Sequence, residues 1–286
     1  MSNPSLSSAS VDELVALSLR LDDEEHEYWR PIRELHERGD RPTFAKARSL
    51  VIDGPGERER ILGIRILAQL GPSERRPFLE ESLPLVEHFA APGQPARLLD
   101  DALIALGHLG DKRSTPVVLA HANHPDPEVR YAVAWTLPSV SGDPPPQAVL
   151  DALFALMEDT DPHVRDWATF GLGSLLEVDT PEVRDALAAR IGDEGEDGDF
   201  GGEALCGLAR RHDPRALGPI LECLEIRDPE PGSLVLDAAQ ALADNRCLPA
   251  LYALREVSND EPWWPASLEA AIEACESGPT RPGRAV

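Results

Sequence analysis

The sequence lacks long apolar runs and a basic start. No apolar stretch reaches the roughly 18 residues that a membrane-spanning helix needs, so no membrane partner is expected. Residues 1–10, MSNPSLSSAS, contain neither a basic residue nor an apolar core, which excludes a secretory signal. These absences predict a cytoplasmic protein.

Cysteine is scarce, and its spacing excludes the usual cysteine sites. The four cysteines stand at positions 206, 223, 247 and 275, and none belongs to a Cys-x-x-Cys pair. Each lies in an apolar helical context, so we expect reduced core thiols rather than disulfides or zinc ligands. No metal site and no cofactor is predicted. The chain also lacks a Gly-x-Ser-x-Gly elbow, a phosphate-binding loop and a His-Glu-x-x-His pair, so no catalytic residue is assigned.

Basic residues are few. The chain has 27 Lys and Arg against 51 Asp and Glu, a net charge of −24. Only two of the 27 are lysines, which suggests a GC-rich, bacterial genome. Residues 1–143 carry a net charge of −7 and residues 144–286 one of −17. This charge repels phosphate backbones, which excludes nucleic acid as a partner, and it attracts basic proteins.

What the chain does contain is an internal repeat. The segment DPEVRYAVAWTLP at 126–138 is followed 35 residues later by DPHVRDWATFGLG at 161–173. Equivalent positions recur at intervals of 31 to 39 residues, at Arg60, Leu99, Arg130, Arg165, Gly201 and Val235. Seven residues after each of them stands a leucine, at Leu67, Leu106, Leu137, Leu172, Leu208 and Leu242.

The residues around these leucines indicate closely packed helices. Small residues mostly occupy the third and eighth positions of the same register, and spacings of three, four and seven place them on one helical face. Gly171 and Gly173 are therefore attributed to helix packing rather than to a nucleotide-binding loop. Asp161 is predicted to cap its helix, with Pro162 in the first turn. Thr-Pro or Asp-Pro opens a second helix in several units.

A helix pair of this length cannot bury its apolar face alone, so the pairs must stack. The DPxVR start, the small-Leu-small pattern and the Thr-Pro second helix resemble the HEAT-repeat family, in particular the short repeats of phycobilisome-type bilin lyases. The resemblance implies an all-α fold, a right-handed α-solenoid of stacked antiparallel helix pairs of HEAT or armadillo type. The expected organisation is a disordered tail (1–10), a helical N-terminal cap (11–53), HEAT-like repeats (54–258), a helical C-terminal cap (259–276) and a second disordered tail (277–286).

The repeated Asp and Arg residues have a structural interpretation. Stacked repeats place Arg130 and Arg165 near Asp126 and Asp161, so the four residues are expected to form a ladder of ion pairs. The His-Glu pairs at 26–27 and 36–37 lie outside the repeats, unlike the iron-binding pairs of HEAT-type hydroxylases. Structural roles are expected for these histidines.

Aromatic residues give the functional prediction. On a helical wheel Tyr131, Trp135 and Phe170 point away from the leucine face, and Asp166 lies beside them. Exposed aromatics in an acidic field are typical of a protein-binding ridge, and packing between repeats is the competing interpretation. We expect Trp135→Ala to weaken partner binding while leaving the melting temperature nearly unchanged, whereas a large loss of stability would place Trp135 in the core.

The leading hypothesis is a noncatalytic scaffold that binds a protein partner, of basic character, through a preformed solenoid surface. The alternative, implied by the resemblance to bilin lyases, is an enzyme that binds a small cofactor. A third class, the HEAT-type DNA glycosylases, is opposed by the charge of −24. The sequence leaves the oligomeric state open.

Overall fold

The computed structural model describes residues 6–23, 25–72, 76–192, 200–225, 233–257 and 264–279. Every regular element in these ranges is helical. The chain divides into two compact units, Met1–Gly142 and Asp143–Val286, and each is described by itself. Within the described ranges, no helix has the length and apolar content that crossing a bilayer requires.

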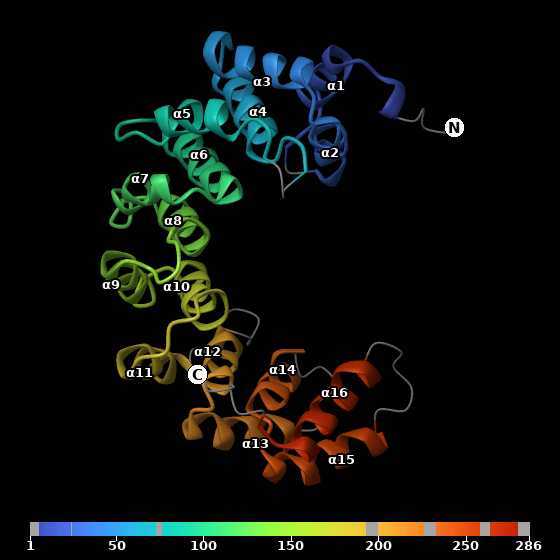
Figure 1. Ribbon diagram of the computed structural model, residues 1–286, viewed down its shortest axis with the longest axis vertical. Coiled ribbons are helices and arrows are strands. Elements are labelled where there is room, and N and C mark those ends of the chain that lie inside the picture. The colour runs from blue at the N-terminus through green and yellow to red at the C-terminus, as the bar shows by residue number, and fades with distance from the viewer. Residues whose placement is uncertain are drawn as a thin grey trace, which may run out of the picture. The chain divides into compact units, whose positions relative to one another are not determined.

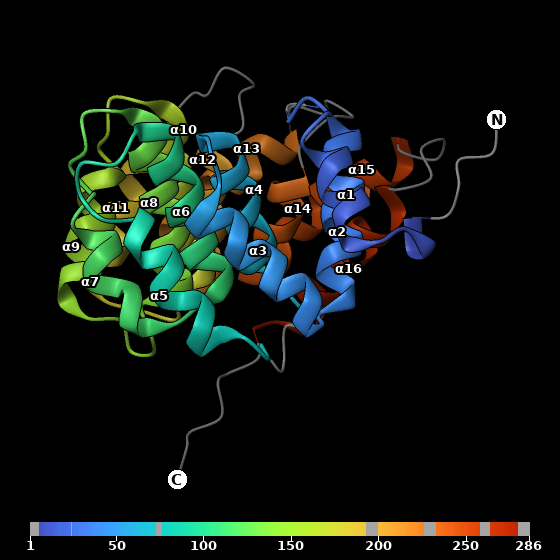
Figure 2. The same cartoon turned by 90° about the horizontal axis from the view of Figure 1, so that it is seen from above.

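In the described part of unit 1, two N-terminal helices are followed along the chain by three antiparallel helix pairs (Figure 1). The second helices of the pairs pack on one another, α4 on α6 and α6 on α8. The first helices, α3, α5 and α7, form the other layer and lie in succession in Figure 2. The bounds are α1 Val11–Ser18, α2 Trp29–Arg38, α3 Arg41–Asp53, α4 Glu57–Ala68, α5 Leu79–Phe89, α6 Ala96–Leu109, α7 Thr115–Leu119 and α8 Pro127–Val140.

Unit 2 continues the same alternation of helices. Helices α12, α14 and α16 pack on one another in succession, and α11 and α15 pack beside α12 and α16. The bounds are α9 Gln147–Leu156, α10 Pro162–Phe170, α11 Pro181–Arg190, α12 Phe200–Arg210, α13 Leu217–Glu225, α14 Ser233–Leu242, α15 Leu248–Val257 and α16 Trp264–Ser277. The expected all-α class, a solenoid of stacked antiparallel helix pairs, is confirmed.

The repeat register places the core correctly. All six repeat leucines are buried, with exposed fractions between 0% and 7%. The predicted close approach of helices is confirmed at Gly173. A Cβ atom built at Gly207 of α12 would lie 2.8 Å from the Cα atom of Gly173. The glycines therefore let two helix backbones touch where larger side chains would separate them.

Caps begin the helices as the sequence predicts. Asp161 accepts hydrogen bonds from the amides of His163 and Val164, and Pro162 occupies the first turn of α10. Thr180 caps α11 in the same way through the amide of Val183. These side chains satisfy amides that have no partner within the helix.

The end of α10 differs from the expected continuous helix. Residues Gly171–Leu175 form a π-helical turn, in which the amide of Leu176 donates to the carbonyl of Gly171. The two glycines allow this wider turn because they carry no Cβ that would clash. The wide turn leaves carbonyl groups without the usual helical partners, and a side chain from the next helix pair reaches them.

That side chain is Arg211, which follows α12 directly. Its guanidinium donates to the carbonyls of Leu172, Gly173, Leu176, Val178 and Gly207, at 2.8 to 3.2 Å. Burial lowers the pKa of Arg211, because the charged form loses solvation in this pocket of carbonyls. The arginine thus closes the π-helical turn and ties it to α12.

A second set of contacts braces the turns that lead from one helix pair to the next pair. Asp111, Asp213 and Asp244 each accept the amide and the guanidinium of the arginine two residues later. Arg113 also reaches back to Glu80 on α5, and Arg215 reaches Asp185 on α11, at 2.6 to 2.9 Å. We call this arrangement the Asp-x-Arg brace. The spacing of the two charges is visible in the sequence, but it did not lead to a prediction of the brace.

Two sequence expectations need correction here. Residues 6–10, assigned to a disordered tail, include a short 3-10 helix, η1 (Leu6–Ser8), and the capping residue Ser10. Arg38 of α2 donates to the carbonyls of Leu6 and Ala9, which fixes this segment on unit 1. At the other end, α16 runs through Ser277, and residues 1–5 and 280–286 lie outside the described ranges.

The boundaries of the repeat region stay predictions. Helix α3, assigned to the N-terminal cap, packs on α4 as α5 packs on α6. The cap therefore contains at least one helix that is paired like a repeat. Residues 258–263, at the start of the predicted C-terminal cap, lie outside the described ranges.

The cysteine prediction holds for three of the four thiols. Cys206, Cys247 and Cys275 are buried, and Cys206 Sγ lies 3.1 Å from the carbonyl of Leu234. The prediction is wrong for Cys223, which is exposed on α13. The prediction considered only the apolar residues near each cysteine in the sequence, and it did not consider which side of the amphipathic helix the cysteine occupies.

Candidate partner-binding face

The predicted ladder residues hold loops and helix starts. Arg130 donates to the carbonyls of His124 and Pro125, at 2.9 and 3.1 Å, and Arg165 makes the equivalent bonds to Asp159 and Thr160. Asp126 caps α8 through the amide of Glu128, as Asp161 caps α10. The four residues thus have structural contacts in their own repeats. A continuous ladder of ion pairs between repeats stays a prediction.

The histidines also make structural contacts. His121 is buried, and its Nε2 lies 2.7 Å from the carbonyl of Ala90. The ring of His36 lies 2.9 Å from the carbonyl of Arg65 in the same manner. Among the described residues, no three His, Cys, Asp or Glu side chains gather as a metal site.

Helices α6 and α8 present the predicted aromatics together with acidic groups. On α6, Asp100, Ile104 and His108 recur every four residues and are half-buried, while the rest of the helix from Leu98 to Leu109 is buried. On α8, Glu128, Tyr131 and Trp135 follow one another at spacings of three and four residues; the charge of Glu128 acts on Asp100, and the Trp135 ring meets His108. We call these six residues the α6–α8 face.

Trp135 is a packing residue as well as a member of this face. Its ring meets His108 edge-on at 4.9 Å between centroids, and a Cβ built at Gly107 would lie 2.4 Å from its Cζ3 atom. Trp135 is half-buried rather than free-standing. The contacts favour packing, the competing interpretation, because the indole fills the space that Gly107 leaves open.

We expect Trp135→Ala to lower the free energy of unfolding by about 2 kcal/mol, less than the loss for a fully buried tryptophan. Urea unfolding followed by circular dichroism measures this difference. Trp29→Ala is the control, because Trp29 is 39% exposed and should cost less. Equal losses in the two variants would contradict the packing role of Trp135.

Asp100 is the unusual charge on the face. It accepts no hydrogen bond and forms no ion pair within the described part of the chain. Burial, and then the negative charges of Asp101, Glu128 and Asp126, raise its pKa to about 7, against an opposing effect of Arg65. A carboxylate that is costly to ionise here would be stabilised by an added cation.

Burial raises the pKa of the adjacent Asp101 too, but this carboxylate has a paired cation. Arg65 of α4 donates to both of its carboxylate oxygens, at 2.5 and 3.1 Å, and also reaches Asp23 at 3.4 Å. The Arg65 guanidinium lies 5.3 Å from the ring centre of Tyr28 and 5.2 Å from that of Trp29. This cluster neutralises Asp101 and joins α4, α6 and the N-terminal helices.

The predicted residues of unit 2 lie on a comparable seam between α10 and α12. Phe170 meets Trp167 edge-on at 5.4 Å, and both Phe170 and Asp166 are half-buried. Burial, and then the charge of Asp166, raises the pKa of Glu203 on α12. Acidic groups therefore accompany an aromatic in this unit too. A single ridge that joins Tyr131 and Trp135 to Asp166 and Phe170 stays a prediction.

Comparisons with known proteins agree with this architecture. The HEAT-repeat family model matches residues 115–141 and 149–179. No curated protein matches the chain. The narrower resemblance to the phycobilisome lyase type stays a prediction.

Solved structures share the fold at low sequence identity. YibA of Escherichia coli is 22% identical with a TM-score of 0.66, over 95% of this chain and 94% of that one. Kap95p, which binds RanGDP, is 15% identical with a TM-score of 0.59, over 96% of this chain but 41% of that one. Since these identities establish the fold alone, the conclusion is a structural one: this chain contains HEAT repeats and has the all-helical fold of HEAT and armadillo solenoids.

Proposed function

We propose that the chain is a noncatalytic scaffold and that the α6–α8 face binds a basic segment of a protein partner. The observation that carries the proposal is Asp100, a half-buried carboxyl in an acidic cluster with no cation paired to it in the described structure. An arginine or lysine from a partner would supply that cation. The neighbouring Tyr131 and Trp135 offer aromatic surface for its stem.

The wider charge supports the same kind of partner. A net charge of −24 draws basic segments toward the protein and raises the association rate at low salt. A stacked-helix surface is preformed, so little ordering entropy is lost on binding. The Asp166, Phe170 and Glu203 seam of unit 2 would take a second basic segment of the same partner.

The test uses a short peptide of alternating arginine and glycine, titrated into the full chain by calorimetry. Because a bound cation favours ionised Asp100, affinity should rise as the pH increases through about 7, the pKa of the free carboxyl. We expect Asp100→Asn to weaken binding about tenfold above this pH and to remove that part of the pH dependence.

The control is Asp53→Asn, which makes the same charge change at an exposed position on α3. It should leave the affinity within a factor of about two, because a distant exposed charge is screened by salt. Equal losses in both variants would mean general electrostatic attraction and no site. The same two variants, used as bait in the native host, distinguish two kinds of protein. Partners that bind this face are lost only with Asp100→Asn, whereas proteins attracted by negative charge in general are recovered equally with both.

A further inference from the structure

An open groove lies in unit 2 between α9 and α11, the first helices of two successive pairs (Figure 1). Each of them packs on the helix that follows it, α9 on α10 and α11 on α12. Phe154 and Met157 of α9 line the groove, and so do Ala186 and Ala189 of α11. Because the two alanine side chains are short, a volume of about 320 Å³ stays open between the helices.

The apolar part of the groove accommodates one large side chain. Met157 is 2% exposed and Phe154 is half-buried, so the groove has the core behind it and an aromatic ring at its surface. An apolar cavity of about 150 Å³ holds a benzene ring, so a phenylalanine side chain fits here with room for the adjoining backbone. Aromatic side chains in such pockets are common anchors of protein interfaces.

Two carboxylates accompany this apolar surface. Glu182 lies in the first turn of α11 and Glu158 follows the end of α9, and both are exposed and line the groove. The Glu158 carboxylate has no hydrogen bond or ion pair with any residue that the structure describes. A hydrogen bond from its own backbone amide, and then one from Thr180, lower the pKa of Glu182, so this carboxylate is ionised at neutral pH.

Arg190 fixes the spacing of the two acids. It lines the groove, and its guanidinium donates to the carbonyl of Met157 at 2.9 Å, which joins the last turn of α11 to the end of α9. Since Glu158 directly follows Met157, it lies at the same end of the groove. Glu182 stands eight residues before Arg190. At about 1.5 Å per helical residue, the two acids are about 12 Å apart along the groove.

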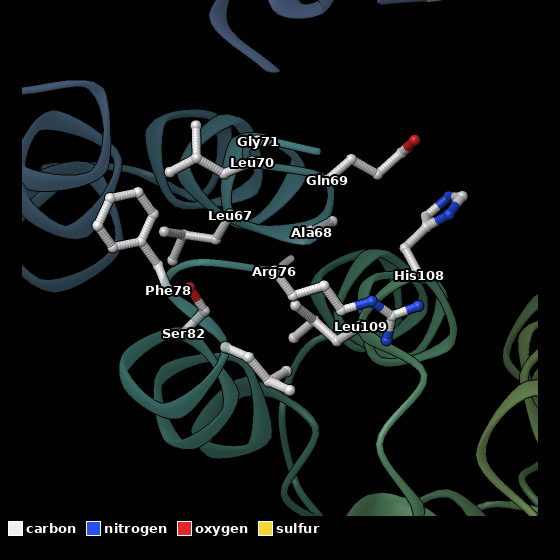
Figure 3. A pocket seen from close by; sticks show the side chains of 11 residues that line it. Leu67, Ala68, Gln69, Leu70, Gly71, Arg76, Phe78, Ser82, His108 and Leu109 are labelled. Carbon is white, nitrogen blue, oxygen red and sulfur yellow. The ribbon is translucent and has the colours of Figure 1, made fainter. Parts of the chain in front are cut away.

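The charge of the lining distinguishes this groove from the cavity of unit 1, which lies where α4, α5 and α6 meet (Figure 3). Arg76 and His108 line that cavity, and no acidic residue is among the described residues of its wall. A basic segment would meet like charge there. The groove of unit 2 offers it two carboxylates, in the half of the chain that carries a net charge of −17.

We infer that this groove docks a short extended segment of a protein partner, in which one large apolar residue stands between two lysines or arginines. The apolar side chain would lie against Phe154 and Met157, and the two cations would pair with Glu158 and Glu182. Alternate side chains of an extended chain point to the same side, and four residue steps span about 13 Å. The segment therefore has the pattern basic-x-apolar-x-basic.

The probe is the peptide Lys-Ser-Phe-Ser-Lys with blocked ends, titrated into the full chain by calorimetry. We expect saturable binding, at least about tenfold tighter than that of Lys-Ser-Ala-Ser-Lys or Glu-Ser-Phe-Ser-Glu. The alanine peptide measures the contribution of the apolar anchor, and the glutamate peptide measures that of charge complementarity. No saturable binding of the probe, or equal binding of either analogue, would overturn the inference.

A substitution that fills the groove tests its shape. Ala189 is exposed on α11, so Ala189→Trp fills the groove from the surface and should weaken the probe at least about tenfold. Ala155→Trp is the matched control, because Ala155 is exposed on α9 and does not line the groove. It should leave the affinity within a factor of about two. Equal losses in the two variants would contradict docking here, and circular dichroism checks that both keep their fold.

Glu158→Gln tests the charge with little change of shape, and should weaken the probe about fivefold. Glu256→Gln, at an exposed position on α15, makes the same charge change outside the groove and should leave the affinity nearly unchanged. Asp100→Asn should also have no effect, because Asp100 belongs to the α6–α8 face in the other unit. If either control lost as much affinity as Glu158→Gln, the probe would be bound by general attraction or by the α6–α8 face, and the inference would fail.

Discussion

Replacement of Arg211 by methionine should lower the free energy of unfolding by about 3–5 kcal/mol. The guanidinium donates to five backbone carbonyls around the π-helical turn, and methionine keeps the stem but offers no donor. Those carbonyls then lose their hydrogen-bond donor. Urea unfolding of the full chain, followed by circular dichroism, measures the loss.

The preceding residue provides the matched control. Arg210 is exposed, so Arg210→Met makes the same charge change without removing the carbonyl contacts. We expect its effect to stay within about 0.5 kcal/mol. Hydrogen exchange adds a local measurement, because the amide of Leu176, which closes the π-helical turn, should lose protection only in Arg211→Met. Equal losses of stability in both variants would show that net charge, rather than the carbonyl contacts, sets the effect.

Two adjacent aspartates should respond to the same substitution with opposite signs. Asp101→Asn should destabilise the protein by about 3 kcal/mol, because it breaks the buried pair with Arg65 and leaves that guanidinium undercompensated. Asp100→Asn should instead stabilise the protein by about 1–2 kcal/mol at pH 8, because it removes a carboxylate that is costly to ionise.

The pH dependence separates the two roles. The pKa of Asp100 is raised in the folded protein to about 7. Its contribution to stability is therefore complete below about pH 4, its unfolded value, and is lost as the pH rises through about 7. The advantage of Asp100→Asn should accordingly vanish on acidification to pH 4. A destabilising effect of Asp100→Asn at pH 8 would mean that this carboxylate has a cationic partner in solution.

Sequence periodicity predicted much of the fold because helix stacking is a local property. The leucines at the repeated position must pack against the adjacent helix pair, and all six of them are buried. Asp161 and Thr180 were predictable caps, since their bonds span only two or three residues. The π-helical turn was not, because it depends on Arg211, which lies 35 or more residues away from three of its carbonyl partners.

The candidate face was half predictable for the same reason. A helical wheel placed Tyr131 and Trp135 away from the leucines, but it describes a single helix and does not show which adjacent helix a side chain contacts. Only the structure shows that Gly107 and His108 of α6 receive the Trp135 ring. Asp100 was missed because its raised pKa comes mainly from burial, and because two of the three acids that raise it, Glu128 and Asp126, belong to a different helix, α8, and its cap.

The Asp-x-Arg brace also has an evolutionary consequence. Each brace closes on its own turn and, at Arg113 and Arg215, on the first helix of the preceding pair. A duplicated helix pair would therefore bring its own brace and present to its neighbour the acid that the next brace needs. Recombination at these turns would change the number of helix pairs and keep the Asp and the Arg of each brace together. The number of repeats can therefore change during evolution by one whole helix pair at a time.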